Sequence, residues 1–445
     1  MEKRPGIFAF AKINILYRIQ FQNRRFKDRL MRDLSRVKPT TSMINSTRRS
    51  AVGREMQWSK RLNRILTSSC LSLMLISSRA TAAQFIEVPP MPVSRDAVQW
   101  PFSSTSIWNT PIGQRAVYVA ANLNDQPGAD GWAPMPQIDA ERIVLKPTSP
   151  LTPLYRSDAG WSGADRCTPG RRLLARVPIP ASYTVPNAVS NSAAVFLGTD
   201  GRTLLQTQPL ARCVGKGPAT ALLMFPAVDL YGEGRSGAHG GSRLSALGGS
   251  LRLGELRPRT VIRHALKINL YGREAFAQCS RPSECFRWPA QSADNNAVMT
   301  YGVDNPNDGG VVRMGALLAI PAWRDLASLG LETEPARLLA WTLQHYGAYL
   351  VDDTGGPAFA IAAEDGPDGA LSAQFKADWG FEFEQRVRDQ TPWVRDMQRL
   401  IRVLHVVVNN SPRSVGGGGK PLQPMAPPLT RNIFKRAQAR SGRGS

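Results

Sequence analysis

Residues 237–272 read GAHGGSRLSALGGSLRLGELRPRTVIRHALKINLYG and hold two of the chain's four histidines. The pairs Gly240-Gly241 and Gly248-Gly249 predict turns or close backbone approaches, because glycine tolerates positive φ and needs no room for a side chain. Residues 261–270 alternate and include β-branched side chains, which predicts a strand. Paired glycines followed by a strand indicate a glycine-rich β fold.

The flanking sequence extends this interpretation. Short extended runs broken by Gly, Pro and Asn fill residues 114–235, a spacing typical of a sandwich or barrel. Two helices are predicted later, one after Thr333 and one after Thr391, each with proline in its first turn and an apolar stripe. We therefore expect one mainly β domain over residues 99–429, sandwich- or jelly-roll-like, with two appended helices.

The basic charge is confined to the ends of the chain. The 445 residues carry a formal net charge of +22, but most of the excess lies in residues 1–83 and 430–445. The nearly neutral body gives no reason to expect a nucleic-acid groove. Residues 430–445 are expected to be a disordered basic tail.

Residues 56–82 have the three parts of a secretory signal peptide: a basic start, an apolar stretch over residues 65–76, and the cleavage signal Ala80-Thr81-Ala82. The apolar stretch is too short to span a bilayer comfortably. The mature chain is expected to begin near Ala83, without a transmembrane helix, and to be secreted or periplasmic.

Two interpretations of residues 1–55 remain open. They form a disordered basic extension, or translation begins at Met56 and the upstream start is wrong. Residues 83–98 are Pro-rich and expected to be extended.

The cysteines indicate an oxidising compartment. Cys70 lies in the segment expected to be removed, which leaves an even set of four. Three pairings are possible. A local Cys279–Cys285 bridge is the simplest, and Cys167 with Cys213 would then close a longer loop. A zinc site is disfavoured, because no Cys-x2-Cys spacing is present.

The central stretch supplies the first candidate site residues. His239 lies between small residues, so we expect an accessible ring that acts as general base. Alternation places Arg263, Lys267 and Asn269 on one strand face, which would suit an acidic or polyhydroxyl ligand or be an ordinary solvated face. His264 falls on the opposite, apolar face, where a hydrogen-bonded core residue is expected.

Aromatic and acidic residues supply the rest. Trp100, Trp108 and Asn109 would form a platform for a sugar ring, or anchor the N-terminal segment to the core. Asp294 and Asp352 are candidate catalytic carboxylates, because glycosidases use a carboxyl pair across the scissile bond. Asp353 and Glu364 are further candidates for that role.

Several motifs together resemble a family of uncharacterised secreted bacterial proteins. They are WPF with WN (100–109), HGGS and LSALGG (239–249), RHALK (263–267) and NN with GGGG (409–419). The resemblance covers roughly residues 98–429. It carries no activity and no catalytic residue to this chain.

Two function classes follow from these residues. The first is a secreted enzyme acting on polysaccharide, a lyase or a glycoside hydrolase, with no tightly bound metal or other cofactor. The second is a non-catalytic carbohydrate-binding or cell-envelope interaction protein, which needs aromatics and amides but no acid–base pair.

Overall fold

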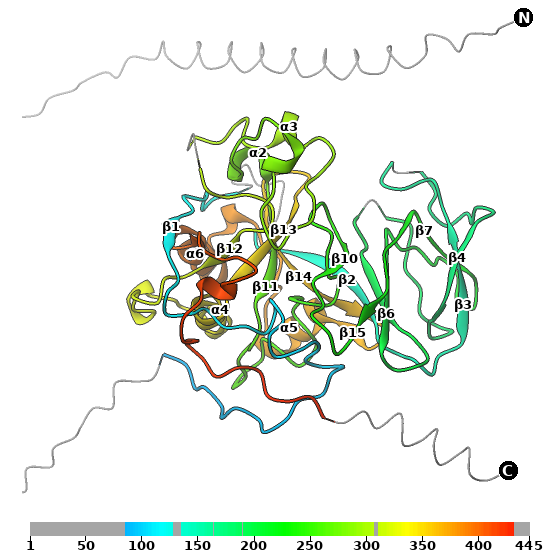
Figure 1. The fold of residues 1–445 in the computed structure, drawn as a ribbon, viewed down its shortest axis with the longest axis horizontal. Coiled ribbons are helices and arrows are strands. Elements are labelled where there is room, and N and C mark those ends of the chain that lie inside the picture. Colours follow the sequence, from blue (N-terminus) through cyan, green and yellow to red (C-terminus); the bar gives the residue numbers. More distant parts are fainter. Residues whose placement is uncertain (1–84, 128–134, 163, 189, 307–309, 431–445) are drawn as a thin grey trace, which may run out of the picture. The chain divides into compact units, whose positions relative to one another are not determined.

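The structure is a computed structural model that describes residues 85–127, 135–162, 164–188, 190–306 and 310–430 (Figure 1). The predicted signal peptide, the basic extension and the tail from residue 431 lie outside the described residues.

Strands dominate the described chain, so the mainly β prediction is confirmed. The strands are β1 (Tyr118–Ala120), β2 (Gln137–Val144), β3 (Leu151–Arg156), β4 (Leu173–Pro178), β5 (Ala194–Leu197), β6 (Thr203–Gln208), β7 (Ala219–Ala221), β8 (Leu223–Met224), β9 (Val228–Asp229), β10 (Ser236–His239), β11 (Leu266–Leu270), β12 (Leu317–Ala319), β13 (Ala348–Asp353), β14 (Phe359–Gly366), β15 (Gly369–Ala370) and β16 (His405–Val407). The α-helices are α2 (Gly272–Ala275), α3 (Ala297–Thr300), α4 (Glu334–His345), α5 (Leu371–Trp379) and α6 (Pro392–Arg402).

The main sheet is mixed. Its order is β1-β16-β12-β13-β11-β14-β2-β5-β6-β8, with β15 paired to β14 and β9 to β6. The pairs β11–β13, β14–β2 and β2–β5 are parallel. The jelly-roll expectation is not confirmed, because that architecture is built from antiparallel strands. Short extended runs in the sequence do not reveal which strands pair in parallel.

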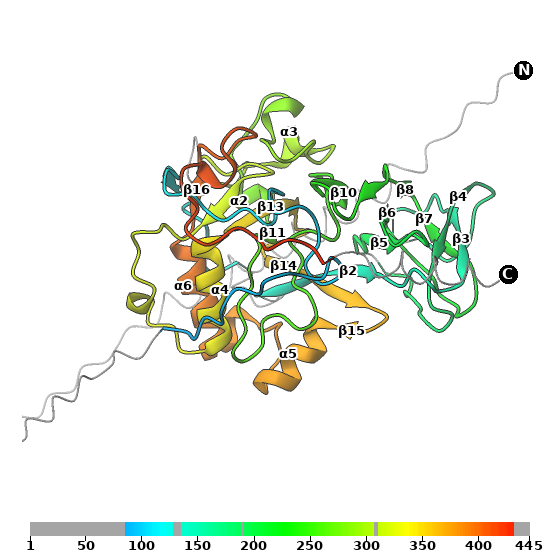
Figure 2. The ribbon, with the colours of Figure 1, turned by 60° about the horizontal axis from the view of Figure 1, so that its bottom comes forward.

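A second sheet, in the order β4-β3-β7, covers a separate small core. That core joins side chains of this sheet to the β5 end of the main sheet, among them Leu154, Val177 and Phe196. In Figures 1 and 2 the β3–β4–β7 sheet lies at the opposite end of the fold from α4 and α6. The described chain thus has a large core and a small one.

The two predicted helices are present as α4 and α6. Thr391 caps α6, since its side chain accepts a hydrogen bond from the Val394 N–H at 3.2 Å. Both helices pack into the core rather than being appended to it, because most residues of α4 and of α6 are buried. The helix α5 was not predicted.

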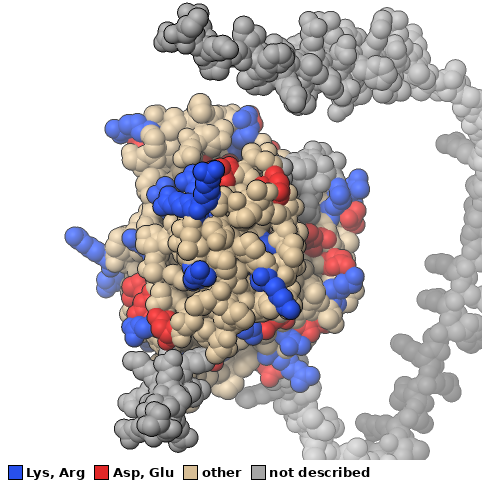
Figure 3. Space-filling model, turned by 90° about the vertical axis from the view of Figure 1, so that its right-hand side faces the viewer, with Lys and Arg blue, Asp and Glu red and all other residues tan. Residues whose placement is uncertain are grey.

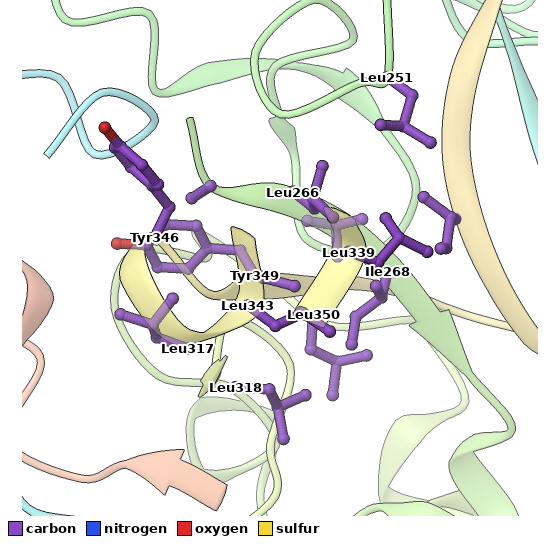
Figure 4. Close-up of a cluster of buried hydrophobic side chains, with 14 of the residues drawn as sticks. Leu251, Leu266, Ile268, Leu317, Leu318, Leu339, Leu343, Tyr346, Tyr349 and Leu350 are labelled. Atoms are coloured by element: carbon purple, nitrogen blue, oxygen red, sulfur yellow. The ribbon is translucent and has the colours of Figure 1, made fainter. Parts of the chain in front are cut away.

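One face of β11 belongs to the large core. Leu266 and Ile268 lie against Leu339 of α4 in the cluster that Figure 4 shows. The alternating Lys267 and Asn269 therefore point to the other face. That face is covered, since Lys267 is fully buried and Asn269 is 3% exposed.

The Gly248-Gly249 pair is explained by Trp108. A Cβ would lie 2.3 Å from the Trp108 indole at Gly248 and 2.6 Å from it at Gly249. The same indole packs edge-on against Tyr349 of β13, with ring centroids 5.5 Å apart. The glycines therefore let the N-terminal segment pack directly on the central stretch.

Two disulfides join the cysteine pairs that the sequence favoured. They are Cys167–Cys213 and Cys279–Cys285, with Cα atoms 5.8 Å and 5.1 Å apart. Both are compatible with an oxidising location outside the cytoplasm. Every helix in the described residues is too short or too polar to cross a bilayer. On the face that Figure 3 shows, basic and acidic side chains are interspersed.

Candidate active site

Asp352 lies at the carboxyl end of β13, beside the end of parallel strand β11. The register pairs it with Asn269, and Asp353 with Leu270. Loops at the carboxyl ends of parallel strands are the usual place for a site in an α/β sheet. The topology therefore places two adjacent carboxyl groups, of Asp352 and Asp353, at the carboxyl ends of two neighbouring parallel strands.

The turn Gly240-Gly241 passes between two carboxyl groups. The Gly241 N–H donates to Asp352 Oδ1 at 2.9 Å. A Cβ at Gly240 would lie 2.1 Å from Asp352 Cγ, and one at Gly241 would lie 2.6 Å from Asp294 Oδ1. Any side chain here would collide with a carboxylate. The paired glycines after His239 therefore exist to let Asp294 and Asp352 approach the backbone.

These carboxyl groups face a cavity of about 450 Å³. Asp294, Asp352 and Asp353 all line it. Its other lining residues include the amides of Asn191 and Gln208, the rings of Trp161 and Phe225, and the Arg243 guanidinium. A cavity of this size with convergent polar groups fits an organic ligand of several rings.

Burial raises the pKa values of the three aspartates in this cavity. Burial raises the pKa of Asp352 to about 8, and repulsion by Asp294 adds to the rise. Burial also raises the pKa of Asp294, against the hydrogen bond from the Tyr301 hydroxyl to its Oδ2 at 2.5 Å. The pKa of Asp353 rises to about 6 through burial. At neutral pH the cavity therefore contains a proton donor, Asp352, and a carboxylate, Asp353.

Gln208 presents an unsatisfied acceptor in the cavity wall. The residue is 4% exposed, and its Oε1 has no hydrogen-bond donor within the part of the chain that the structure describes. A buried amide oxygen without a partner costs about 1–3 kcal/mol.

Behind the cavity lies a fully buried charged cluster. His239 Nδ1 contacts Glu141 Oε1, and its Nε2 lies 3.3 Å from Asn269 Oδ1. The Lys267 ammonium donates to the same Glu141 oxygen at 2.7 Å and to the Ser245 carbonyl at 2.8 Å. Two basic groups thus share one carboxylate in the protein interior.

The buried groups of this cluster shift one another's pKa values. Burial alone would raise the pKa of Glu141, but Lys267 and His239 outweigh it, and the pKa is lowered. Burial opposes the charged form of His239, yet Glu141 and then Asp139 raise its pKa overall. The pKa of Lys267 is lowered, because burial outweighs its attraction to Glu141. The interaction with His239 in turn lowers the pKa of Asp352, a smaller effect than that of burial.

Strand β14 leaves room for this cluster. It runs between β11 and β2, and it places Ala360 opposite Asn269 and Ala362 opposite Asp139. Residues directly opposite one another project from the same sheet face. The small alanines let Asn269 Nδ2 reach across to Asp139 Oδ2 at 2.8 Å.

Asp139, Glu141 and His239 are the one group among the described residues that could hold a metal ion. Their ligand atoms lie within 4.8 Å of one another. The Lys267 ammonium already contacts Glu141 Oε1 at 2.7 Å, so a cation is present beside the carboxylate without a metal. This cluster therefore needs no ion to balance its charge.

Comparison of the chain with protein-family models, with curated proteins and with solved structures gave no match. The functional argument therefore rests on the geometry of this cavity.

The structure corrects the expected roles of three residues in the central stretch. His239 is fully buried rather than accessible, because its ring points into the core toward Glu141. Lys267 and Asn269 lie in the same cluster instead of on a ligand-facing or solvated surface. All three stand behind the cavity and do not line it.

Arg263 and His264 also lie away from the cavity. Arg263 donates to the Pro89 carbonyl and stands 5.8 Å from the Trp341 ring centroid. His264 is 7% exposed, with Nε2 3.0 Å from Glu255 Oε1, in agreement with the expected hydrogen-bonded core residue.

The aromatic pair near the N-terminus acts as an internal anchor. The Trp108 indole N–H donates to the Gly234 carbonyl at 2.7 Å, and the ring is buried. The Trp100 indole donates to Asn109 Oδ1 at 2.8 Å, and Asn109 itself is 1% exposed. These three residues satisfy one another and the backbone, so they offer no open platform for a sugar.

Sequence reasoning missed four residues of the site and its support. Asp139 and Glu141 are separated by one residue on β2, so alternation alone would place both carboxylates on one strand face. Nothing in the sequence signals Asn191 or Gln208, because their importance depends on long-range packing. The structure places Asp294 and Asp352, two of the four candidate carboxylates, at the same cavity.

Proposed function

We propose that this protein is a secreted hydrolase that cleaves glycosidic bonds of a polysaccharide in the 450 Å³ cavity. The observation that carries the proposal is the pair of carboxyl groups, Asp294 and Asp352, that both lie against the Gly240-Gly241 turn and line the cavity. Glycosidic hydrolysis requires two carboxyl groups, one that donates a proton and one that accepts a proton.

The raised pKa of Asp352 gives it the acid role, and we assign the base role to Asp294. Asp352 is protonated at neutral pH, since its pKa is raised to about 8. It gives its proton to the glycosidic oxygen as the bond to the anomeric carbon breaks. Asp294, on the other side of the turn, accepts a proton from the water that adds to that carbon. The products are a new reducing end and a free hydroxyl.

The cavity walls suit a sugar chain. The amides of Asn191 and Gln208 can exchange hydrogen bonds with hydroxyl groups. The rings of Trp161 and Phe225 offer flat apolar surfaces to the carbon–hydrogen face of a sugar. These side chains support a polyhydroxylated ligand over a simple apolar one.

A lyase is less well supported. Such an enzyme needs cationic groups against the substrate carboxylate and an accessible base. Among the described cavity residues the cation is Arg243, whereas Lys267 is fully buried in its pair with Glu141. Hydrolysis therefore fits the distribution of charge better than elimination.

Secretion is part of the proposal. It rests on the signal peptide expected at residues 56–82 and is supported by the two disulfides. A polysaccharide outside the cytoplasm would then meet the enzyme.

A substrate panel tests the reaction. The purified protein is incubated with polygalacturonate, alginate, xylan and mixed-linkage β-glucan. Reducing ends and the ultraviolet absorbance of unsaturated ends are recorded together. Hydrolysis produces reducing ends without the absorbance, whereas both signals would indicate a lyase.

Non-catalytic glycan binding is the second candidate, and the amides and aromatic rings that line the cavity favour it equally. Retention of the protein on one of these polymers in affinity electrophoresis, with neither chemical signal, would support binding and contradict hydrolysis.

A further inference from the structure

A second cavity of about 710 Å³ lies beside the proposed active site. It is lined in part by Trp288, Glu233, Arg235, Ser236 and Ala227. None of these residues takes part in the acid–base chemistry described above. An indole, a carboxylate, a guanidinium and a hydroxyl line this cavity, so it offers both aromatic and polar groups to a ligand.

The two cavities are built from the same segments of chain. The segment after β8 lines the first cavity with Phe225 and the second with Ala227. The segment before α3 lines the first with Ser292 and the second with Trp288. Each shared segment runs from one cavity into the other within four residues, so the cavities are neighbours.

The wall between the two cavities is narrow and is held by hydrogen bonds. Arg243 lines the first cavity and Ser236 the second. The Gln291 side-chain amide donates to both the Arg243 carbonyl and Ser236 Oγ, each at 2.9 Å. The Gly237 N–H also donates to the Arg243 carbonyl, at 3.0 Å. A single hydrogen-bonded layer therefore separates the cavities.

We propose that the second cavity is a binding subsite that continues the active site, so that the substrate is a long glycan chain spanning both. This proposal rests on the proposed function. Trp288 is half-buried and offers its indole face to one sugar ring. Glu233, held by Ser103 Oγ at 2.9 Å, and Arg235 supply an acceptor and a donor for sugar hydroxyls.

A substrate that crosses the hydrogen-bonded layer and occupies both cavities predicts cleavage inside the chain rather than at its end. A polymer that occupies both cavities has sugar units on each side of the bond beside Asp352. Internal cleavage lowers the viscosity of a polymer solution early, before many reducing ends accumulate. Short fragments reach one cavity only and lose the contacts of the other.

Binding to a ladder of oligosaccharides tests the subsite. Fragments of two to eight sugars are made from the panel polymer that the protein retains, and their affinities are measured by calorimetry. We expect affinity to rise with length beyond the fragment that fills the first cavity. Trp288→Ala should weaken the eight-sugar fragment about tenfold and leave the two-sugar fragment unchanged.

Two further variants keep the test decisive if Trp288→Ala folds poorly. Ala227→Trp places a bulky ring at an exposed lining position and should obstruct the second cavity, with the same loss for the long fragment. Trp323→Ala, at an indole that is 67% exposed and outside both cavities, is the matched control and should change neither affinity.

The outcomes separate this inference from the proposed reaction. Length-dependent affinity that Trp288→Ala abolishes, without bond cleavage, supports the subsite and contradicts hydrolysis. Cleavage with equal affinity for two and eight sugars overturns the subsite alone. Equal effects of Trp288→Ala and Trp323→Ala also overturn it, and failure to retain any panel polymer contradicts both proposals.

Discussion

The raised pKa of Asp352, about 8 against roughly 3.9 in an unfolded chain, links protonation to stability. Between these two values the folded protein holds a proton that the unfolded chain has released. Stability from this group is therefore fully present below pH 4 and is lost as the pH rises toward 8.

The Asp352→Asn variant should lack this slope, because asparagine does not titrate. We expect the melting temperature of the wild type to fall relative to the variant between pH 4 and pH 8, and the difference to stay constant above that. Thermal denaturation of both proteins across this range measures it. Parallel curves would mean that Asp352 keeps an ordinary pKa in the folded state.

The pair of Glu141 and Lys267 makes a second prediction at the residue scale. Both side chains are buried, with Lys267 Nζ 2.7 Å from Glu141 Oε1. Lys267→Met should lower the free energy of unfolding by about 3–5 kcal/mol, since it removes one partner of a buried ion pair. The double variant Glu141→Leu/Lys267→Met should cost less than the two single changes combined, because it leaves no orphaned charge.

Urea denaturation of the four proteins gives the coupling. Additive costs would show that the two charges do not depend on each other. His239→Ala should also destabilise the fold, in contrast to an accessible histidine, because its buried ring contacts Glu141.

What the sequence could predict at this scale depended on local pattern. The alternation of β11 correctly separated Lys267 and Asn269 from Leu266 and Ile268. It could not say that β10 and its glycines would cover the polar face, because burial there depends on segments far away in the sequence. A histidine flanked by Ala238 and Gly240 therefore indicated an exposed ring, whereas the ring is buried.

At the scale of elements, Asp396 of α6 caps the start of α4. It is fully buried and accepts hydrogen bonds from the Glu332 and Thr333 N–H groups at 2.9 Å and 2.7 Å. Its carboxylate also pairs with Arg399 at 2.8 Å. These contacts join the two helices and satisfy N–H groups that no helical carbonyl can reach.

Asp396→Ala should therefore lower the free energy of unfolding by about 2–4 kcal/mol, because charged acceptors are strong and the orphaned N–H groups stay buried. Chemical denaturation measures the loss. Asp304→Ala is the control, since its pair with Arg273 is half-exposed and should contribute less than about 1 kcal/mol. Equal effects of the two changes would refute the capping role.

Helix starts were predictable because Thr333, Pro335, Thr391 and Pro392 are local signals. The parallel pairs β11–β13 and β14–β2 were not, because strand order depends on long-range contacts. This is why the sequence indicated a sandwich while the chain forms a mixed sheet with buried helices. Asp294 and Asp352 were candidates by residue type alone. The fold is what places both side chains at one cavity, beyond the carboxyl end of β13.

At the scale of the whole molecule, the expected export of the chain predicts its mature form. Mass spectrometry of exported protein should place the N-terminus within a few residues of Ala83, since small-residue signals at Ala80 and Ala82 precede it. An exported form that retains residues 1–55 would contradict the signal peptide.

The disulfides predict the redox state of the same mature chain. Without reduction, thiol labelling should find no reactive cysteine, because Cys167, Cys213, Cys279 and Cys285 are all paired. Labelling of two or more cysteines in native protein would show that at least one bridge is absent.

The acid–base role of Asp352 is the central claim, and the rate of reducing-end release tests it most directly. The comparison is between wild type, Asp352→Asn and Asp158→Asn, the last at a carboxylate whose side chain is 81% exposed. The account predicts that Asp352→Asn lowers the rate by about 10²–10⁴-fold while the fold persists, and that Asp158→Asn is unchanged. Undiminished release by folded Asp352→Asn would contradict it.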